Sequence, residues 1–148
     1  MKSQLSRSPK LLLAGEGELF QMLNLTFTQK INSDNTQGAW VMHEITGCLG
    51  EGAPLHSHPW AETFYVLDGE VEVQVGNRKA TATPGTLMHV PENVAHSFGI
   101  SSPTSRMLEI IPASAEGFYR ETGEKVPTLP PDLEVFQAIC QKYNVRLF

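Results

Sequence analysis

Three histidines and one glutamate in this chain have the types and the spacing of metal ligands. His56 and His58 stand two residues apart, Glu62 follows four residues later, and His96 lies further along the sequence. Side chains two residues apart on a strand point to the same side, about 6.6 Å from each other, so both imidazoles can reach one point. A bend at residues 59–61 would let Glu62 present its carboxylate from a neighbouring position.

Three imidazoles and one carboxylate make a ligand set with a definite chemistry. Such a set suits divalent Fe, Mn, Ni, Cu or Zn, and it leaves coordination positions free for water, dioxygen or a chelating substrate. The predicted cofactor is therefore one divalent transition metal, whose identity the sequence leaves open. Glu62 is also the candidate catalytic residue, because a carboxylate ligand can leave the metal and act as a base.

Short strands are the elements that must hold these side chains. The clearest pair covers residues 62–67 and 70–75, which are connected by Asp68-Gly69, a preferred hairpin-turn pair. In the second of these strands valines alternate with polar residues, as expected for a strand with one buried face. So many short strands with turn residues between them predict an all-β sandwich or barrel. The further strands are expected at residues 18–31, 38–46, 78–83, 86–90, 97–100 and 106–111.

The length of the chain favours one folded domain, because 148 residues are enough to bury a genuine core. We expect a flexible N-terminal arm at residues 1–17, which are polar or glycine-rich. The strands then occupy residues 18–112. Residues 113–148 change character and are expected to form a helical tail packed on the strands.

Two short helices are predicted in this tail. Ser114 can cap the first helix, which would end at Gly123. Asp132, directly after two prolines, can open the second helix, in which apolar residues recur at helical spacing. The second helix is therefore expected to have one apolar side, and the tail as a whole is expected to pack on the strands.

Composition and charge narrow the classes of partner. The net charge is −5 and the eleven basic residues form no run, which argues against binding to nucleic acid. No apolar run is long enough to cross a membrane, so no membrane partner is expected. The expected partner is a small-molecule substrate.

The cysteines and the first residues bear on the compartment. Cys48 and Cys140 lie far apart in a chain that is large enough to fold without disulfides, so both are expected to be free thiols in a reducing compartment. The apolar stretch at residues 11–14 is too short for the core of a secretory signal. These features predict a cytoplasmic protein.

The spacing of the first three candidate ligands is part of a longer motif. The chain reads Gly50-x5-His56-x-His58-x3-Glu62-x6-Gly69. This pattern resembles the first motif of the cupin superfamily at every defined position. By this resemblance His56, His58 and Glu62 are metal ligands.

A second motif, Gly85-x5-Pro91-x4-His96, resembles the second cupin motif less fully. Thr83 stands where the family has a proline, and Ile100 stands where it has an asparagine. Neither departure falls on a metal ligand, so they bear on the local turns. By this resemblance His96 is the fourth ligand.

The resemblance covers most of the chain. Residues 55–76, 84–98 and 116–124 and the tail from residue 130 look like one-domain quercetin-dioxygenase-like cupins. The resemblance implies a double-stranded β-helix, or jelly-roll, barrel with short C-terminal helices that binds one metal ion. It also implies a homodimer.

The leading hypothesis for function is a metal-dependent dioxygenase that acts on a small apolar or aromatic molecule of the enol or diketone type. The alternatives are a non-oxidative cupin isomerase or decarboxylase, and a cupin that binds a small molecule without turnover. Residues 38–46 and 62–75 contain no Lys or Arg that could clamp a phosphate, which argues against sugar-phosphate substrates.

Several other residues have open roles. His89 is interpreted as a buried structural histidine or as an acid, base or hydrogen-bond donor of the pocket. His43 and Glu44 point in opposite directions, so at most one of them faces the interior. Trp60 either shields the site or anchors the bend beside it. The candidates for apolar pocket walls are Trp40, Phe64, Val66, Val73, Leu87, Met88 and Phe98.

Overall fold

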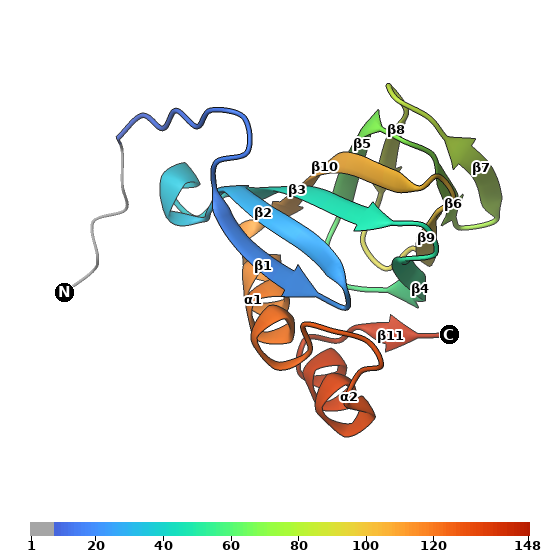
Figure 1. Cartoon of the computed structure of the whole chain (residues 1–148). Coiled ribbons are helices and arrows are strands. Elements are labelled where there is room, and N and C mark those ends of the chain that lie inside the picture. The colour runs from blue at the N-terminus through green and yellow to red at the C-terminus, as the bar shows by residue number, and fades with distance from the viewer. Residues whose placement is uncertain (1–7) are drawn as a thin grey trace.

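The computed structural model describes residues 8–148 and shows a mostly β fold with two short C-terminal helices, as predicted (Figure 1). Part of the predicted N-terminal arm, residues 1–7, lies outside the described residues. The strands form two antiparallel sheets of six and five strands. No helix within residues 8–148 is long and apolar enough to span a membrane.

The larger sheet has the strand order β1-β2-β3-β10-β5-β8. Its members are β1 (Glu18–Met22), β2 (Leu25–Ile31), β3 (Trp40–Cys48), β10 (Thr104–Pro112), β5 (Glu62–Asp68) and β8 (Leu87–Val90). The smaller sheet has the order β11-β4-β9-β6-β7. Its members are β11 (Arg146–Leu147), β4 (Gly52–Ser57), β9 (His96–Ile100), β6 (Val71–Val75) and β7 (Arg78–Ala82).

The core lies between the inner faces of these two sheets. Strands β5, β9 and β10 bury every second side chain, which is the pattern of a strand with one face toward the core. Phe64 of the larger sheet and Phe98 of the smaller sheet are both buried, and their ring centroids are 5.9 Å apart. The two inner faces therefore meet, and side chains from both sheets can share one site.

The prediction of one strand over residues 18–31 is wrong, because this segment is the hairpin β1–β2. Met22 pairs with Leu25, and the two residues between them, Leu23 and Asn24, have φ values of 52° and 72°. Positive φ at both central residues is typical of tight hairpin turns, and asparagine tolerates it well. Leucine is not a turn residue, so the sequence pattern concealed the turn.

The first helix also differs from the prediction. It consists of a short 3₁₀ turn, Ala113–Ala115, followed by α1 (Glu116–Lys125), and no side chain caps its start. Ser114 is therefore not the cap, and Gly123 does not end the helix. A Cβ on Gly123 would lie 2.8 Å from the Phe20 ring, so this glycine allows α1 to pack closely against β1.

The second helix agrees with the prediction. It is α2 (Leu133–Lys142), and the side chain of Asp132 accepts a hydrogen bond from the Val135 backbone N–H. The sequence did not predict β11, which follows α2 and pairs with β4. In this pairing Leu147 lies opposite His56, so the C-terminal segment adjoins a strand that carries a candidate ligand.

The prediction of a hairpin over residues 62–67 and 70–75 is wrong, because β5 pairs with β10 and β8 in the larger sheet and β6 pairs with β7 and β9 in the smaller one.

Close packing around the turn that connects β5 to β6 across the two sheets generates a prediction about stability. Gly69 has a φ of +81°, and a Cβ on it would lie 2.3 Å from the Thr104 carbonyl oxygen. We expect Gly69→Ala to lower the free energy of unfolding by about 2–4 kcal/mol, as measured by urea denaturation, because it adds a steric clash to the cost of positive φ.

Gly76→Ala is the matched control for this prediction. Gly76 also has positive φ, +58°, but the nearest atom to its Cβ, on Val94, is 3.9 Å away. Only the backbone cost remains there, about 1–2 kcal/mol. Equal losses of stability in the two variants would contradict the role assigned to the clash at Gly69.

Candidate metal centre

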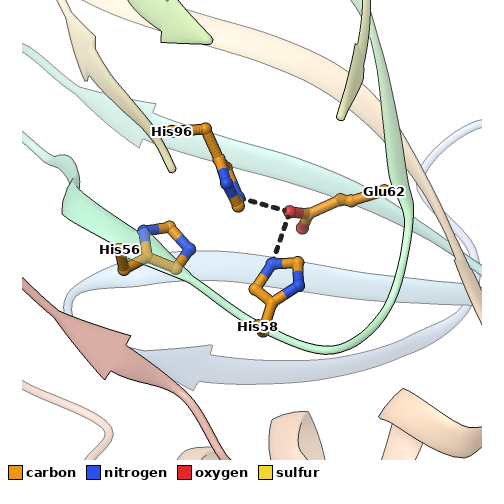
Figure 2. Close-up of side chains that lie close together, drawn as sticks. All are labelled: His56, His58, Glu62 and His96. Atoms are coloured by element: carbon orange, nitrogen blue, oxygen red, sulfur yellow. Dashed lines mark hydrogen bonds and ion pairs between the residues drawn. The ribbon is translucent and has the colours of Figure 1, made fainter. Parts of the chain in front are cut away.

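The two sheets together bring the four candidate ligands to one point (Figure 2). His56 on β4 and His96 at the start of β9 are paired residues of the smaller sheet. His58 follows the end of β4, and Glu62 is the first residue of β5 in the larger sheet. The ligand atoms of the four side chains all lie within 4.8 Å of one another. His58, Glu62 and His96 are buried, and His56 is partly exposed.

Backbone carbonyls orient all three imidazole rings. A carbonyl oxygen only accepts hydrogen bonds, so each Nδ1 must carry the hydrogen, and Nε2 is the atom left to bind a metal. This arrangement is typical of histidines prepared to bind a metal. Each Nδ1 faces a carbonyl two residues away in the chain: His56 faces Pro54 at 2.7 Å, His58 faces Trp60 at 2.9 Å and His96 faces Val94 at 2.9 Å.

The distances around Glu62 fit a metal ion. Its Oε2 lies 3.0 Å from His58 Nε2 and 2.9 Å from His96 Nε2. Nitrogen and oxygen lone pairs repel at this distance unless positive charge lies between them, either as a proton or as a cation. Neighbouring ligands bound at right angles to one ion, with bonds of about 2.1 Å, would lie about 3.0 Å apart. The described residues therefore fit a divalent transition metal.

The electrostatics of the site favour the same conclusion. Burial alone raises the pKa of Glu62, but hydrogen bonds with Glu109, His58 and His96 outweigh it and hold this pKa well below its usual value. Burial, and then the neighbouring His96, lower the pKa of His56 to about 4. Glu62 is therefore ionised and His56 neutral at pH 7, which are the states that bind a metal.

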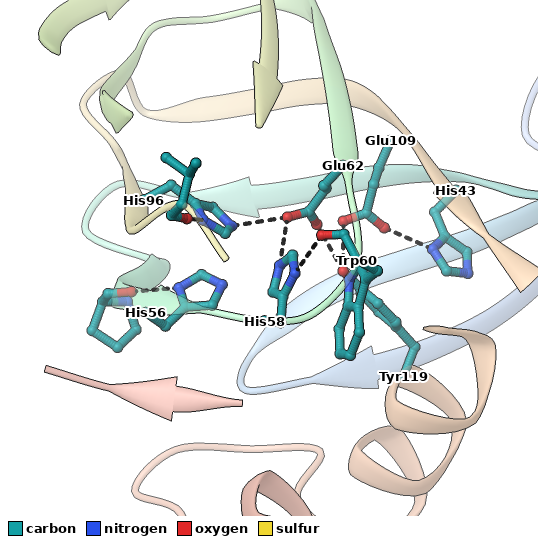
Figure 3. A network of polar contacts seen from close by, with 10 residues as sticks. His43, His56, His58, Trp60, Glu62, His96, Glu109 and Tyr119 are labelled. Carbon is teal, nitrogen blue, oxygen red and sulfur yellow. Dashed lines mark hydrogen bonds and ion pairs between the residues drawn. The ribbon is translucent and has the colours of Figure 1, made fainter. Parts of the chain in front are cut away.

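A buried polar network extends from Glu62 away from the histidines (Figure 3). The Tyr119 hydroxyl, which comes from α1, lies 2.7 Å from Glu62 Oε1 and 3.0 Å from Glu109 Oε2. The other oxygen of Glu109 lies 2.8 Å from His43 Nδ1. His43 Nε2 lies 3.4 Å from the amide nitrogen of Gln29. Glu62 is thus tied to β10, β3 and β2 by side chains alone.

The pKa shifts within this network have opposite directions for its two carboxyl groups. Burial, and then the charge of Glu62, hold the pKa of Glu109 well above its usual value, which favours the protonated form of this group. Burial, and then Glu109, raise the pKa of Tyr119 well above its usual value. Burial lowers the pKa of His43 to about 4. The directions of these shifts favour a network whose negative charge resides on Glu62.

Sequence reasoning did not find this network. It left His43 and Glu44 undecided, and the structure places His43 in the interior and Glu44 outside, near Lys30 and Arg106. Glu109 did leave a signal, because it occupies an inward position of β10 among apolar residues. No signal pointed to Tyr119, because α1 meets the site only through the folding of the tail.

Trp60 shields the site, which is the first of the two roles considered for it. Its indole stacks on the His58 ring with centroids 4.2 Å apart and an angle of 10° between the planes. Its carbonyl oxygen also accepts the hydrogen bond from His58 Nδ1. Trp60 is buried, so one residue orients His58 and covers it from solvent.

Both interpretations of His89 are wrong. The side chain is exposed on the outer face of β8, where its Nδ1 lies 2.8 Å from the Thr63 hydroxyl. Two proposed pocket walls are wrong as well, because Trp40 and Leu87 are 39% and 61% exposed on the outer side of the larger sheet. In each case the side chain occupies the outward register of its strand.

A largely apolar cavity opens beside the candidate ligands His56, His58 and Glu62. Of the predicted pocket walls, Phe64 and Phe98 line it, and α2 and the C-terminal segment complete it. Glu109 and Tyr119 are its other polar side chains that can ionise. The apolar side chains on its walls include Met22, Leu23, Leu25, Phe27, Ile45, Phe64, Phe98, Phe118, Phe136, Val145 and Leu147.

Comparisons with known proteins agree with the motifs. A family model described as a cupin domain matches residues 49–111. The chain is 30% identical over 122 residues, or 78% of its length, to a quercetin 2,3-dioxygenase of Bacillus subtilis (strain 168). It spans 35% of the length of that relative. The resemblance to cupins that the motifs carry is confirmed.

Solved structures agree on the fold. An RmlC-like cupin from Shewanella frigidimarina NCIMB 400 matches with a TM-score of 0.64 and 19% identity, over 75% of this chain and 96% of that one. The polyketide cyclase RemF from Streptomyces resistomycificus matches with a TM-score of 0.63 and 20% identity, over 72% of this chain and 80% of that one. At these identities the likeness concerns the fold alone.

Removal of one candidate ligand tests the centre directly. We expect His58→Ala or His96→Ala to weaken the binding of a divalent metal by at least about 100-fold, because even partners of metal ligands contribute 10–100-fold. Elemental analysis of purified protein measures the loss, and circular dichroism checks that the strands remain. His89→Ala, which removes an exposed histidine outside the site, is the control and should keep the metal. Unfolding of both ligand variants would instead indicate a structural metal.

Proposed function

We propose, on the premise that this chain belongs to the cupin superfamily, that it is a metal-dependent dioxygenase for a small apolar or aromatic enol or diketone. Its metal ligands would be His56, His58, Glu62 and His96, whose ligand atoms converge from both sheets. The metal would be one divalent ion of Fe, Mn, Ni, Cu or Zn.

The observation that carries this proposal is the contact between the ligand set and an apolar cavity. His56, His58 and Glu62 line the cavity together with many apolar side chains. Among the described residues on its walls there is no Lys or Arg to bind a phosphate or carboxylate. A neutral, apolar molecule that coordinates through oxygen atoms is the class of substrate that suits such walls.

The residues of the chain would have distinct tasks in the reaction. A bound metal ion supplies Lewis-acid and redox chemistry. The Glu62 carboxylate would accept the proton of the enol hydroxyl on moving from ligand to base, and the three imidazoles would stay oriented by their backbone carbonyls. The apolar walls would exclude water from the reacting atoms.

The relative supports oxidative chemistry more than any particular substrate. It is named a quercetin 2,3-dioxygenase, and its similarity extends over 78% of this chain. Because the chain spans only 35% of that protein's length, flavonol cleavage is not carried over as a whole activity. An enol or diketone is the coarser class that the cavity itself supports.

Oxygen uptake tests this function. Protein loaded with Fe, Mn, Ni or Cu and supplied with a panel of enols and diketones should consume dioxygen in step with loss of substrate, as measured with an oxygen electrode and chromatography. His58→Ala should lower the rate by at least about 100-fold, since it removes a ligand.

The other possible outcomes separate the alternatives. Substrate loss without oxygen uptake would identify an isomerase or decarboxylase. Stoichiometric binding without any product would identify a binding protein. No oxygen uptake with any metal form and any member of the panel would contradict the proposed dioxygenase.

We further propose that residues 18–112 form one strand-rich domain and that residues 113–148 form a helical tail packed on it. We also propose that the protein is cytoplasmic and forms a homodimer. A cytoplasmic location suits Cys48 and Cys140, which are not paired with each other. A homodimer suits the outer face of the larger sheet, which exposes apolar side chains. On this face Trp40, Tyr65, Leu87 and Ile110 are 39%, 43%, 61% and 40% exposed.

A charge placed on this face tests the dimer. Leu87 is the most exposed of these four residues, and it pairs across strands with Tyr65. We expect wild-type protein to sediment as a dimer and Leu87→Glu as a monomer, because the interface would then bury an unpaired carboxylate. Leu133→Glu is the control, since Leu133 is 64% exposed on α2 and should not affect assembly. A monomeric wild type would contradict the proposed dimer.

A further inference from the structure

The two oxygens of Glu62 have different surroundings. Oε2 faces His58 Nε2 at 3.0 Å and His96 Nε2 at 2.9 Å. Oε1 lies on the other side and contacts the Tyr119 hydroxyl at 2.7 Å. One carboxylate oxygen is therefore turned toward the ligand histidines, and the other is occupied by a protein side chain.

The Tyr119 hydroxyl has one hydrogen, and its neighbours indicate which carboxylate accepts it. This hydroxyl contacts both Glu62 Oε1 and Glu109 Oε2, and it can donate to only one of them. The Gln29 amide donates to His43 Nε2, so His43 Nδ1 carries a hydrogen and donates to Glu109 Oε1. Glu109 Oε1 therefore already has a donor. Of the two contacts of the Tyr119 hydroxyl, the one with Glu62 Oε1 is shorter, 2.7 Å against 3.0 Å for Glu109 Oε2, so we assign its hydrogen to Glu62.

Aromatic packing fixes the position of this hydroxyl. Tyr119 is 5% exposed, and its ring lies against Phe27, His43 and Phe118 with centroids 5.8, 5.3 and 5.5 Å away. A hydroxyl on a ring held on several sides has little freedom to move away from Glu62.

The helix that carries Tyr119 is itself anchored. Glu116, at the start of α1, accepts hydrogen bonds from the Ser33 backbone N–H and the Ser33 hydroxyl, both at 2.9 Å. Gly123 brings the same helix close to Phe20 of β1. The donor to Glu62 is therefore positioned by contacts at both ends of α1.

We propose that Tyr119 is a positioning residue that reserves one oxygen of Glu62, so that Glu62 binds the metal through Oε2 alone. This inference rests on the proposed metal centre. A carboxylate that binds through both oxygens occupies an additional coordination position. By holding Oε1, Tyr119 keeps that position open for a ligand from the cavity, whose wall includes both Glu62 and Tyr119.

Cobalt(II) is a suitable probe, because its visible absorption reports its coordination. The experiment compares wild type, Tyr119→Phe and Tyr143→Phe during titration with Co²⁺ alone. We expect Tyr119→Phe to raise the Kd for Co²⁺ about 10–100-fold and, at saturation, to change the visible bands, because Oε1 becomes free to bind. Tyr143→Phe removes a hydroxyl that contacts Glu121 outside the site and should leave both quantities unchanged.

The saturated spectrum separates positioning from mere structural support. If Tyr119 only stabilised the fold, Tyr119→Phe would lower the melting temperature but leave the visible spectrum of the Co²⁺-saturated protein as in wild type. That result would overturn the inference. If Tyr119→Phe does not fold, a crystal structure of Co²⁺-loaded wild type decides: Glu62 bound through Oε2 alone supports the inference, and both oxygens on the metal overturn it. Absence of Co²⁺ binding to wild type would overturn the proposed centre as well.

Discussion

One buried negative charge, on Glu62, governs the arrangement of this protein. A carboxylate in an interior of this kind is costly unless positive charge and hydrogen-bond donors surround it. His58 and His96 approach one of its oxygens, and the Tyr119 hydroxyl approaches the other. Strands from both sheets and a helix from the tail are needed to supply these groups. The fold around Glu62 thus keeps one ionised carboxylate away from solvent while both of its oxygens contact polar side chains.

The register of the strands makes this possible. His56 and His96 are direct partners on adjacent strands, and Glu62 is in the inward register of the facing sheet. A slip of one residue in either sheet would turn a ligand to the solvent side. The ring nitrogens are then selected by backbone carbonyls, which need no further side chain. The site therefore depends on chain geometry more than on specialised residues around it.

The sequence predicted the parts of this structure that are encoded locally. The two strands that flank Asp68-Gly69 and the convergence of His56, His58 and Glu62 follow from spacing within one continuous segment. The pairing of these two strands as a hairpin was predicted wrongly, because β5 and β6 find their partners in different sheets through long-range contacts. The turn at Leu23-Asn24 was missed because the observed backbone conformation, with positive φ at a leucine, contradicts local preference. Tyr119 and β11 were missed for another reason: each meets the strands only through long-range packing of the tail, which no local pattern records.

The stacking of Trp60 on His58 has a consequence for how the centre can be observed. The chain has two tryptophans, and the other, Trp40, is 39% exposed on the far side of the larger sheet. The indole of Trp60 lies 4.2 Å, ring centre to ring centre, from an imidazole of the candidate centre. A paramagnetic ion at that imidazole would quench the emission of so near an indole. The protein thus contains an intrinsic fluorophore whose brightness would report occupancy of the centre by such an ion without any added label.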